Sequence, residues 1–356
     1  MWNAEEPFNE LMPPPSAALE TPKVLKAAIE ARAALAALNQ ATRSIPNPGT
    51  LVGTIPLLEA QASSEVENIV TTSDELFRLA SDVEGVASPG AVETFRYRQA
   101  LYAGAEMVKA RPLGATTVIG VGSKIRGTEV SVRVGPGTHI GNPVTGEVIY
   151  TPPVGQQLIW QKLREWEVFV HSNPGLDPLV VMAAAHYQFE AIHPFTDGNG
   201  RTGRVLNVLF LLEFGLLQEP VLYLSKFINE NKAEYYRRLL AVTERQEWEA
   251  WVLFMLEAVQ KTSQQSLEMV EAIQAVREEF REQMRETSAG VNADLLDLLF
   301  EQPYTRIKSV MEACGVSRPT ATKWLRGLVD DGLLVERQAG RERLFVNTAL
   351  LEVLEG

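Results

Sequence analysis

The segment "IHPFTDGNGRTGR", residues 192–204, gathers the side chains of this chain that are best suited to chemistry. Its residues 198–200, Gly-Asn-Gly, allow backbone N–H groups to approach an anion at the start of the apolar helix that follows, where the positive end of the helix favours negative charge. Arg201 and Arg204 are three residues apart and share one face of that helix's first turn. Guanidinium groups suit bidentate contacts with phosphate oxygens, so the segment predicts a site for more than one phosphate.

Two more side chains of this segment indicate a reaction. Asp197 would repel neighbouring phosphates unless a cation bridged them, so Mg²⁺ is implied. His193 stands before the loop, held by Pro194 and Phe195, where it would accept a proton from an incoming hydroxyl group. A base, a metal ligand and a phosphate clamp together predict nucleotidyl or phosphoryl transfer from a nucleoside triphosphate. The chain has neither a GxxxxGK[ST] loop nor a strand-linked GxGxxG, which excludes the usual nucleotide-binding folds.

Helix formers dominate the elements that must position this segment, and the predicted fold class is mainly α. Helices are predicted from Thr21, an N-cap followed by Pro22, and then over residues 56–69, 76–109 with a break at "SPGA", 156–170, 178–191 and 201–214. From Val259 to Met284, apolar and small side chains recur at steps of three and four, which predicts a long helix with one stripe packed against the same chain.

Residues 128–153 are the exception to this helical pattern. Val130, Val132 and Val134 alternate with polar residues, and turn residues followed by "EVIY" come next. Alternation with a period of two is typical of a strand, so we predict a β-hairpin embedded in a helical protein.

The composition is that of an ordinary soluble protein with an acidic balance. The 356 residues are 46% hydrophobic and 22% charged, with a formal net charge of -12, which argues against general coating of nucleic acid. The single cysteine, Cys314, excludes an internal disulfide and fits a reducing compartment. The N-terminus lacks the apolar core of a secretory signal, and the most apolar run, 205–217, is too short to span a bilayer. We therefore expect a cytoplasmic protein without a membrane segment.

The segment "ETSAG", residues 286–290, indicates a linker, and residues 291–356 form a predicted second domain. Its pattern of helix, turn, helix and short hairpin with Gly340 at the tip resembles a winged helix-turn-helix. Residues 302–346 carry eight basic and five acidic residues, which is a weak electrostatic footprint. DNA binding and docking against protein, either the catalytic half or a second copy, are both left open. The basic residues that would face phosphates are Arg318, Lys323, Arg326, Arg337, Arg341 and Arg343.

The motif "HPFTDGNGRTGR" is similar to the HPFx[D/E]GNGRxxR signature of the Fic family of adenylyltransferases and matches it at every fixed position. The resemblance implies a mainly helical domain that moves AMP from ATP to a hydroxyl side chain of a protein. It implies that His193 deprotonates the target hydroxyl, that Asp197 binds Mg²⁺ and that Phe195 anchors the loop in the core. The residues implied to hold the phosphates of ATP are Gly198, Asn199, Gly200 and Arg201 for the α- and β-phosphates, and Arg204 for the γ-phosphate.

Two further segments resemble parts of this family. The hairpin that ends in "EVIYTPP" is similar to the family's flap, which aligns the target segment by adding it as a β-strand; a plain structural hairpin is the alternative. "NKAEYYRRL" resembles the helix on the adenine side, so that Tyr235 or Tyr236 would touch the base, and burial of either ring in the core is the alternative. More distant relatives place an asparagine near Thr243 for the base, and this chain lacks it there.

The segment "SSEVEN" on the predicted helix 56–69 matches the [S/T]xxxE[G/N] inhibitory motif of many Fic proteins at Ser63, Glu67 and Asn68. Pairing of Glu67 with Arg204 would occupy the γ-phosphate clamp and place a negative charge where ATP needs a positive one. Taken alone, the pattern is also that of the polar face of a surface helix. Together with the full signature, it predicts autoinhibition.

The predicted layout has three parts: an N-terminal helical region, 1–110, with the inhibitory helix at about 56–69; a catalytic domain, 111–287, with the flap at about 128–153 and a long C-terminal helix; and the winged domain, 291–356. The predicted function is transfer of AMP from ATP to Ser, Thr or Tyr of a protein, including this chain itself. The alternatives are transfer of another phosphate moiety, removal of AMP with Glu67 orienting water, and a nucleotide-sensing DNA-binding regulator. The sequence names no target and leaves a homodimer open.

Overall fold

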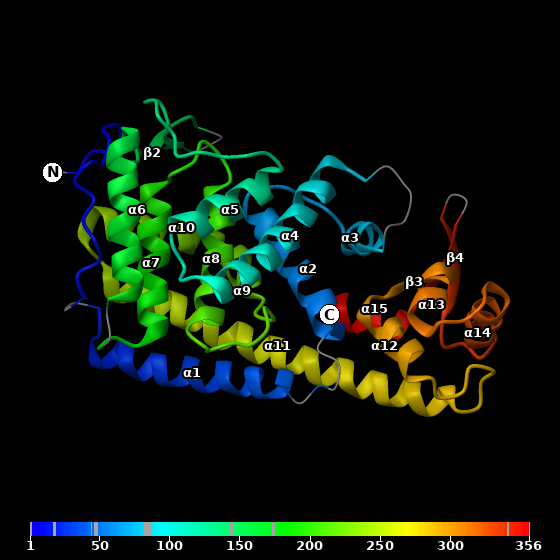
Figure 1. Cartoon of the computed structure of the whole chain (residues 1–356). Helices are drawn as coiled ribbons and strands as arrows, with labels where there is room; N and C mark the ends of the chain where they lie inside the picture. The colour runs from blue at the N-terminus through cyan, green and yellow to red at the C-terminus, as the bar shows by residue number, and fades with distance from the viewer. Residues whose placement is uncertain are drawn as a thin grey trace.

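The computed structural model describes residues 2–16, 19–43, 45, 49–81, 87–141, 145–172, 175–339 and 342–355. Helices dominate it and the sheets are small and antiparallel, so the prediction of a mainly α fold is confirmed. The molecule is elongated, with a large helical body at one end and a smaller unit beside the far end of the long helix α11 (Figure 1). In the part of the chain that the structure describes, no helix combines the length and the apolarity needed to cross a membrane.

The helices of the body follow one another along the chain, and a long connection between two of them, residues 127–155, holds a short hairpin. In chain order they are α1 (Pro22–Arg43), α2 (Gly49–Val66), α3 (Ser73–Ala80), α4 (Pro89–Ala110), α5 (Ala115–Arg126), α6 (Gln156–His171), α7 (Pro178–Ile192), α8 (Asn199–Glu213), α9 (Leu224–Glu230), α10 (Lys232–Arg245) and α11 (Trp248–Met284).

Helix α7 forms the centre of the body because its sequence is apolar nearly all round. Every residue from Leu179 to Phe189 is buried, as expected for a helix surrounded by others. Asp177 caps its start by accepting a bond from Leu179 N at 2.8 Å, and Pro178 occupies the first turn. The helix packs against α6, α8 and α11, so a rigid element carries His193 at its C-terminal end.

Helix α8 packs against α2, α4, α5 and α7. Close packing on α4 depends on Gly104, where an added Cβ would lie 2.5 Å from Leu209 Cδ1. Helices α2 and α4 come from the N-terminal region, so that region covers one side of α8.

The stripe predicted on the long helix packs against the same chain, as expected. Helix α1 lies along α11, which Figure 1 shows at the lower edge of the molecule, and α12 and α15 contact α11 as well. The predicted stripe positions that are buried on α11 are Val259, Thr262, Ser266, Ile273, Phe280 and Met284.

The strand predicted through Val130, Val132 and Val134 is wrong. The segment is extended, but no strand is formed at these residues. Its backbone is bonded to the loop after α7 instead, where Arg133 N donates to Pro194 O at 3.0 Å. Val132 is 1% exposed and Val134 is 67% exposed, so the alternation does not place all three valines on one buried face.

The hairpin is therefore shorter than predicted. Strand β1 (Ile140–Gly141) pairs antiparallel with β2 (Val148–Tyr150), and residues 142–144 of the predicted flap lie outside the described residues.

Helix α2 has different bounds from the predicted helix at 56–69. It begins at Gly49, continues through Pro56 and ends at Val66. Proline in a helix interior costs about 3 kcal/mol, and burial of the neighbouring Ile55 and Leu57 offsets this cost. The earlier end places Glu67 in the turn after the helix rather than on the helix.

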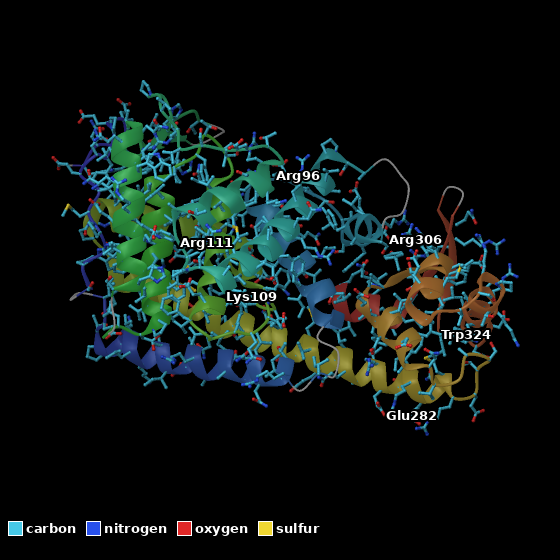
Figure 2. The ribbon with its side chains drawn as sticks, in the orientation of Figure 1. Arg96, Lys109, Arg111, Glu282, Arg306 and Trp324 are labelled. Atoms are coloured by element: carbon cyan, nitrogen blue, oxygen red, sulfur yellow. The ribbon has the colours of Figure 1, made fainter. Side chains whose placement is uncertain are left out.

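The C-terminal unit has the predicted order of helix, turn, helix and hairpin, although its identity as a winged helix-turn-helix stays a prediction. Gly340, the predicted tip, and Arg341 lie outside the described residues. Figure 2 shows Trp324 of α14 at the end of the molecule far from α6 and α7. The elements are α12 (Ala293–Glu301), β3 (Tyr304–Arg306), α13 (Ile307–Cys314), α14 (Arg318–Asp330), β4 (Val335–Ala339), β5 (Glu342–Val346) and α15 (Thr348–Glu355), with the antiparallel sheet order β3-β5-β4.

This unit is docked on the body through α2, α3 and α11. Helix α12 packs on α2, and Arg277 of α11 pairs with Asp297 at 2.5 Å. Tyr304 OH donates to Asp74 of α3, and Arg337 Nη1 lies 3.9 Å from Oδ1 of the same carboxylate. The unit therefore contacts the N-terminal region through α2 and α3 and the predicted catalytic domain through α11, while DNA binding and docking on a second copy stay open.

Deleting residues 291–356 is expected to leave a folded body that binds ATP but melts several degrees lower. Helices α7 and α8 lie upstream of the cut, whereas the buried Phe280 on α11 loses its edge-to-face contact with the Phe300 ring. Full burial of such a side chain contributes about 1.5–3 kcal/mol. Thermal unfolding and an ATP-binding titration check this expectation. An insoluble product, or a folded one that no longer binds ATP, would show that the boundary at 291 is wrong.

Candidate active site

The loop between α7 and α8 is closed by its own side chains. Phe195 is 1% exposed and packs on Gly122 of α5, where an added Cβ would lie 2.8 Å from the ring. Asn199 is buried as well: its Nδ2 donates to Phe195 O at 2.9 Å and its Oδ1 accepts from Phe195 N at 2.8 Å. The Asn199 side chain therefore holds the loop closed, while its backbone forms the first residue of α8.

His193 ends α7 in the left-handed conformation, with φ 49° and ψ 60°. This conformation is uncommon for a residue with a side chain. Burial and the nearby Arg133 guanidinium lower the pKa of His193 to about 4, against the raising effects of Glu67 and Asp197. The imidazole is therefore neutral near pH 7, which is the form that accepts a proton.

Helix α8 begins at the residues 198–200, for which the sequence predicts an anion site. Gly198 is the N-cap, with φ 83° in the left-handed region, and its carbonyl accepts from Thr202 N at 3.0 Å. The N–H groups of a first turn have no partner within the helix, and the dipole is positive there. An added Cβ at Gly200 would lie 2.3 Å from Glu67 Oε1, so a carboxylate rests against this end of the helix.

Arg204 is 1% exposed and is held by the end of α2. Its Nε donates to Ser63 Oγ at 2.8 Å, and its Nη2 donates to Ser63 O at 2.8 Å and to Glu67 Oε1 at 2.9 Å. Burial lowers the pKa of Arg204, but the Glu67 carboxylate and other acidic groups more than reverse this effect. For the Glu67 carboxyl, burial raises the pKa, but the charge and hydrogen bond of Arg204 lower it below its ordinary value. Both groups are therefore ionised, and the expected pair is present as a contact.

Asn68 gives a physical reason for the Gly or Asn at the end of the inhibitory pattern. Its φ of 62° lies in the left-handed region, which glycine and asparagine adopt most readily. The turn is closed by Ile69 N, which donates to Ser64 O at 3.0 Å, and by Lys232 of α10, which donates to Asn68 Oδ1 at 2.9 Å. This turn fixes the place from which Glu67 reaches Arg204.

Two more charged residues of the site were missed by the sequence analysis. Glu93 of α4 accepts a bond from Arg201 Nη1 at 2.5 Å, and the Arg201 side chain is 3% exposed. Arg126 at the end of α5 is ion-paired with Asp197, and Arg201 Nη2 lies 3.9 Å from Asp197 Oδ1. No motif spacing links residues 93 and 126 to the loop, because packing of α4 and α5 on α8 brings them there.

Asp197 fits the chemistry of a Mg²⁺ ligand. Its carboxylate is 55% exposed, and Mg²⁺ is usually held by one or two carboxylates together with substrate phosphates and water. Within the described residues, no group of three or more His, Cys, Asp and Glu side chains could hold a metal. The donor set therefore fits a metal that arrives with the phosphates of a nucleotide.

The structure separates the two tyrosines considered for the adenine. Tyr235 is 1% exposed, and its OH is hydrogen-bonded to His186 Nε2 at 2.8 Å. Tyr236 is 40% exposed and contacts Tyr235 edge to face. Thr243, where relatives place an asparagine, is bonded to Tyr187 OH at 2.9 Å. Of the two rings, Tyr236 presents the larger surface to a ligand.

Replacing Asn199 with alanine is expected to destabilise the nucleotide-free protein by roughly 2–4 kcal/mol, because the buried N–H and C=O of Phe195 lose their partners at about 1–3 kcal/mol each. Urea unfolding measures this change. Asn229→Ala, which removes a partly buried bond to Glu65 at 3.0 Å, is the matched control with a smaller expected loss. Equal stability of wild type and Asn199→Ala would contradict the loop-closing role.

Three family models match successive parts of the chain. The Fic/DOC family N-terminal model matches residues 25–106, and the Fic/DOC family model matches residues 123–211, which include the loop at α8. The model for the C-terminal domain of SoFic-like protein adenylyltransferases matches residues 276–350, beginning within α11.

Curated relatives match over a shorter region. Protein adenylyltransferase fic-1 of Caenorhabditis elegans is 36% identical over 89 residues, which are 24% of this chain and 16% of that protein. Protein adenylyltransferase Fic of Drosophila melanogaster is 33% identical over 105 residues, 30% of this chain and 20% of that protein. The match thus spans a fifth or less of the length of these relatives.

Solved structures share the fold over a longer stretch. A Fic family protein from Desulfovibrio desulfuricans superposes with a TM-score of 0.60 at 18% identity, over 94% of this chain and 98% of that one. Fic-1 of C. elegans, residues 134–508, superposes with a TM-score of 0.51 at 18% identity, over 71% and 74%. At 18% identity these likenesses show the shared fold. The three family models, which together match most of the chain, show that it belongs to the Fic/DOC family.

Proposed function

We propose that this chain transfers AMP from ATP to the hydroxyl group of a serine, threonine or tyrosine in a protein, including its own chain. The observation that carries the proposal is a neutral His193 beside the anion-binding start of α8, with Arg201 and Arg204 on its first turns. The relatives matched over this region are named protein adenylyltransferases, which supports the same reaction class.

The proposed reaction is a displacement at the α-phosphorus of ATP. His193 accepts the proton of the target hydroxyl, the hydroxyl oxygen bonds to the α-phosphorus, and the bond to the β-phosphate oxygen breaks with release of pyrophosphate. Backbone N–H groups of residues 198–200 and Arg201 stabilise the charge on the α- and β-phosphates, and Arg204 binds the γ-phosphate. Mg²⁺ held by Asp197 would neutralise phosphate charge when bound.

The target segment is proposed to dock on the flap as an added strand. Support comes from the β1–β2 hairpin and from its attachment to the active-site loop through Arg133 N and Pro194 O. Strand addition reads the backbone more than the side chains, so it does not define a single target sequence.

The Glu67–Arg204 pair is proposed to restrain the enzyme. Its carboxylate rests against Gly200 and occupies the guanidinium proposed to bind the γ-phosphate, so productive ATP binding requires Glu67 to leave. Within the same class, the alternatives are transfer of another phosphate moiety and removal of AMP with Glu67 orienting water.

A DNA-binding regulator is the alternative from a different class, and one surface favours it. Arg318, Lys323 and Arg326 line one open face of α14, and they take part in no ion pair within the described ranges. Arg337 and Arg343, on the hairpin, are instead paired with Asp74 and Glu336. The α14 face would therefore be the surface for an anionic partner.

Intact-mass measurement after incubation with ATP and Mg²⁺ tests the proposed function directly. An added AMP supports it, while unchanged mass of the chain and of added protein, together with a mobility shift of random duplex DNA, would favour the regulator.

His193→Ala is expected to abolish AMP transfer and to leave ATP binding nearly unchanged, because the base acts on the target hydroxyl rather than on the nucleotide. A general base typically contributes ~10²–10⁴-fold. Transfer from labelled ATP and an ATP-binding titration measure the two properties. Similar transfer rates in both proteins would remove His193 from the mechanism.

Glu67→Gly is expected to raise the rate of AMP transfer, because Arg204 is freed for the γ-phosphate. Hydrogen bonds to charged groups contribute on the order of 1.5–3 kcal/mol, which corresponds to roughly ten- to a hundredfold more productively bound ATP at ~1.4 kcal/mol per factor of ten.

The matched variant Glu67→Gln keeps the shape of the side chain and removes its charge, which separates release of Arg204 from loosening of the turn by glycine. If both variants modify themselves and added protein no faster than wild type, Glu67 does not restrain the enzyme.

A further inference from the structure

Arg133 is a buried arginine without a carboxylate partner in the described part of the chain. Arg133 is 4% exposed, and its Nη1 has no hydrogen-bond partner among the described residues. Burial lowers the pKa of Arg133, but arginine remains charged in proteins. Because a buried charge is costly unless bonds compensate it, the position of this guanidinium requires a structural reason.

The bonds of Arg133 converge on the backbone around His193. Its Nε donates to His193 O at 2.7 Å, and its Nη2 donates to Pro153 O at 2.5 Å and to Ile192 O at 3.3 Å. Its backbone N donates to Pro194 O at 3.0 Å. The residue thus spans the end of α7, the loop after it and the segment that follows β2.

Tyr150, the last residue of β2, acts on the same helix end. It is 6% exposed, and its OH donates to Ala191 O at 2.8 Å. The last carbonyls of a helix have no partner within the helix, and a cation is favourable at that negative end. Arg133 and Tyr150, near the two ends of the flap segment (residues 128–153), together cap the C-terminus of α7.

We infer that Arg133, supported by Tyr150, is a positioning residue for the transfer reaction: it holds His193 in the left-handed conformation and joins the base to the flap segment in one rigid unit. This role rests on the proposed function. A docked target and the base would then keep a fixed geometry, and a misplacement of about 1 Å at a reacting centre can cost about 10²-fold in rate.

The charge of Arg133 has a second consequence at His193. Burial and the Arg133 charge lower the pKa of the imidazole, while a hydrogen bond to the Glu190 backbone and the charges of Glu67 and Asp197 raise it. Removing the Arg133 charge therefore raises the pKa of His193 toward its ordinary value of 6.5. Since the neutral imidazole is the active form, the acid limb of the rate profile moves to higher pH.

Kinetics in the Glu67→Gly background test this role. Arg133→Met, which keeps the length and apolar stem, is expected to lower kcat by about 10²-fold, to leave the Kd of ATP within about twofold and to move the acid limb of kcat to higher pH. Arg133→Lys keeps the charge but cannot make the forked contacts, so it is expected to lower kcat without moving the limb. Tyr150→Phe is also expected to lower kcat, by a smaller factor than Arg133→Met does.

Arg32→Met is the matched control. Arg32 bonds Asp177, the cap at the other end of α7, at 3.0 Å, so its loss perturbs the same helix but not the base, and kcat should be unchanged. Unchanged kcat in Arg133→Met, or a parallel loss of kcat and ATP affinity with the acid limb in place, would overturn the positioning role.

An NMR titration measures the pKa of the His193 imidazole, and thus the effect of the Arg133 charge on it, without requiring turnover. The His193→Ala variant identifies the His193 signal. A higher His193 pKa in Arg133→Met supports the inference, and an unchanged pKa contradicts it. If Glu67→Gly itself transferred no AMP to any protein, the proposed function would fail, while this titration would still decide whether Arg133 acts on His193.

Discussion

The charge of Arg204 is the constraint on which the arrangement of the site depends. This guanidinium is buried between α8 and the end of α2, and a buried charge is costly unless an opposite charge or hydrogen bonds compensate it. Glu190 lies nearby, but burial raises the pKa of its carboxyl to about 8, so it is mostly protonated near neutral pH. Glu67 therefore neutralises Arg204 in this structure, and a phosphate of ATP is proposed to replace it. Helices α2, α4 and α9 pack so as to keep this partner within reach.

The sequence predicted the parts of this site that are local in the chain. Arg201 and Arg204 share a helix face because their spacing is three, and the glycines of 198–200 lie at a helix start because an apolar run follows. The partner of Arg204 was predicted from a pattern, and the structure adds its physical basis: the residue after Glu67 must adopt the left-handed conformation, which Asn68 does at φ 62°. Periodicity also predicted the helices well, since helical bonds are local.

The parts that the sequence did not predict depend on contacts between distant segments. Val130, Val132 and Val134 alternate as a strand does, but the segment's backbone is bonded to Ser123 Oγ and Pro194 O, which no periodicity can indicate. In the sequence, Arg133 is only one of the polar residues in that alternation, whereas in the structure its guanidinium bonds the carbonyls at the end of α7. No motif predicted the contact of Glu93 with Arg201, because packing of α4 on α8 brings the two residues together. Buried charges and their partners are thus the least local, and the least predictable, features of this site.

Release of Arg204 does not require α2 to move. That helix is packed by α4, α9 and α12, so its displacement would uncover a large apolar surface. Glu67, in contrast, lies beyond the helix end, and its side chain is 34% exposed although its partner is 1% exposed. A partly solvated carboxylate can rotate into water at much lower cost than a buried one, while the incoming phosphate takes over the guanidinium bonds. The proposed restraint would therefore be a property of one side chain at the end of a fixed helix, and the affinity for ATP would be set by competition between two anions for the same buried cation.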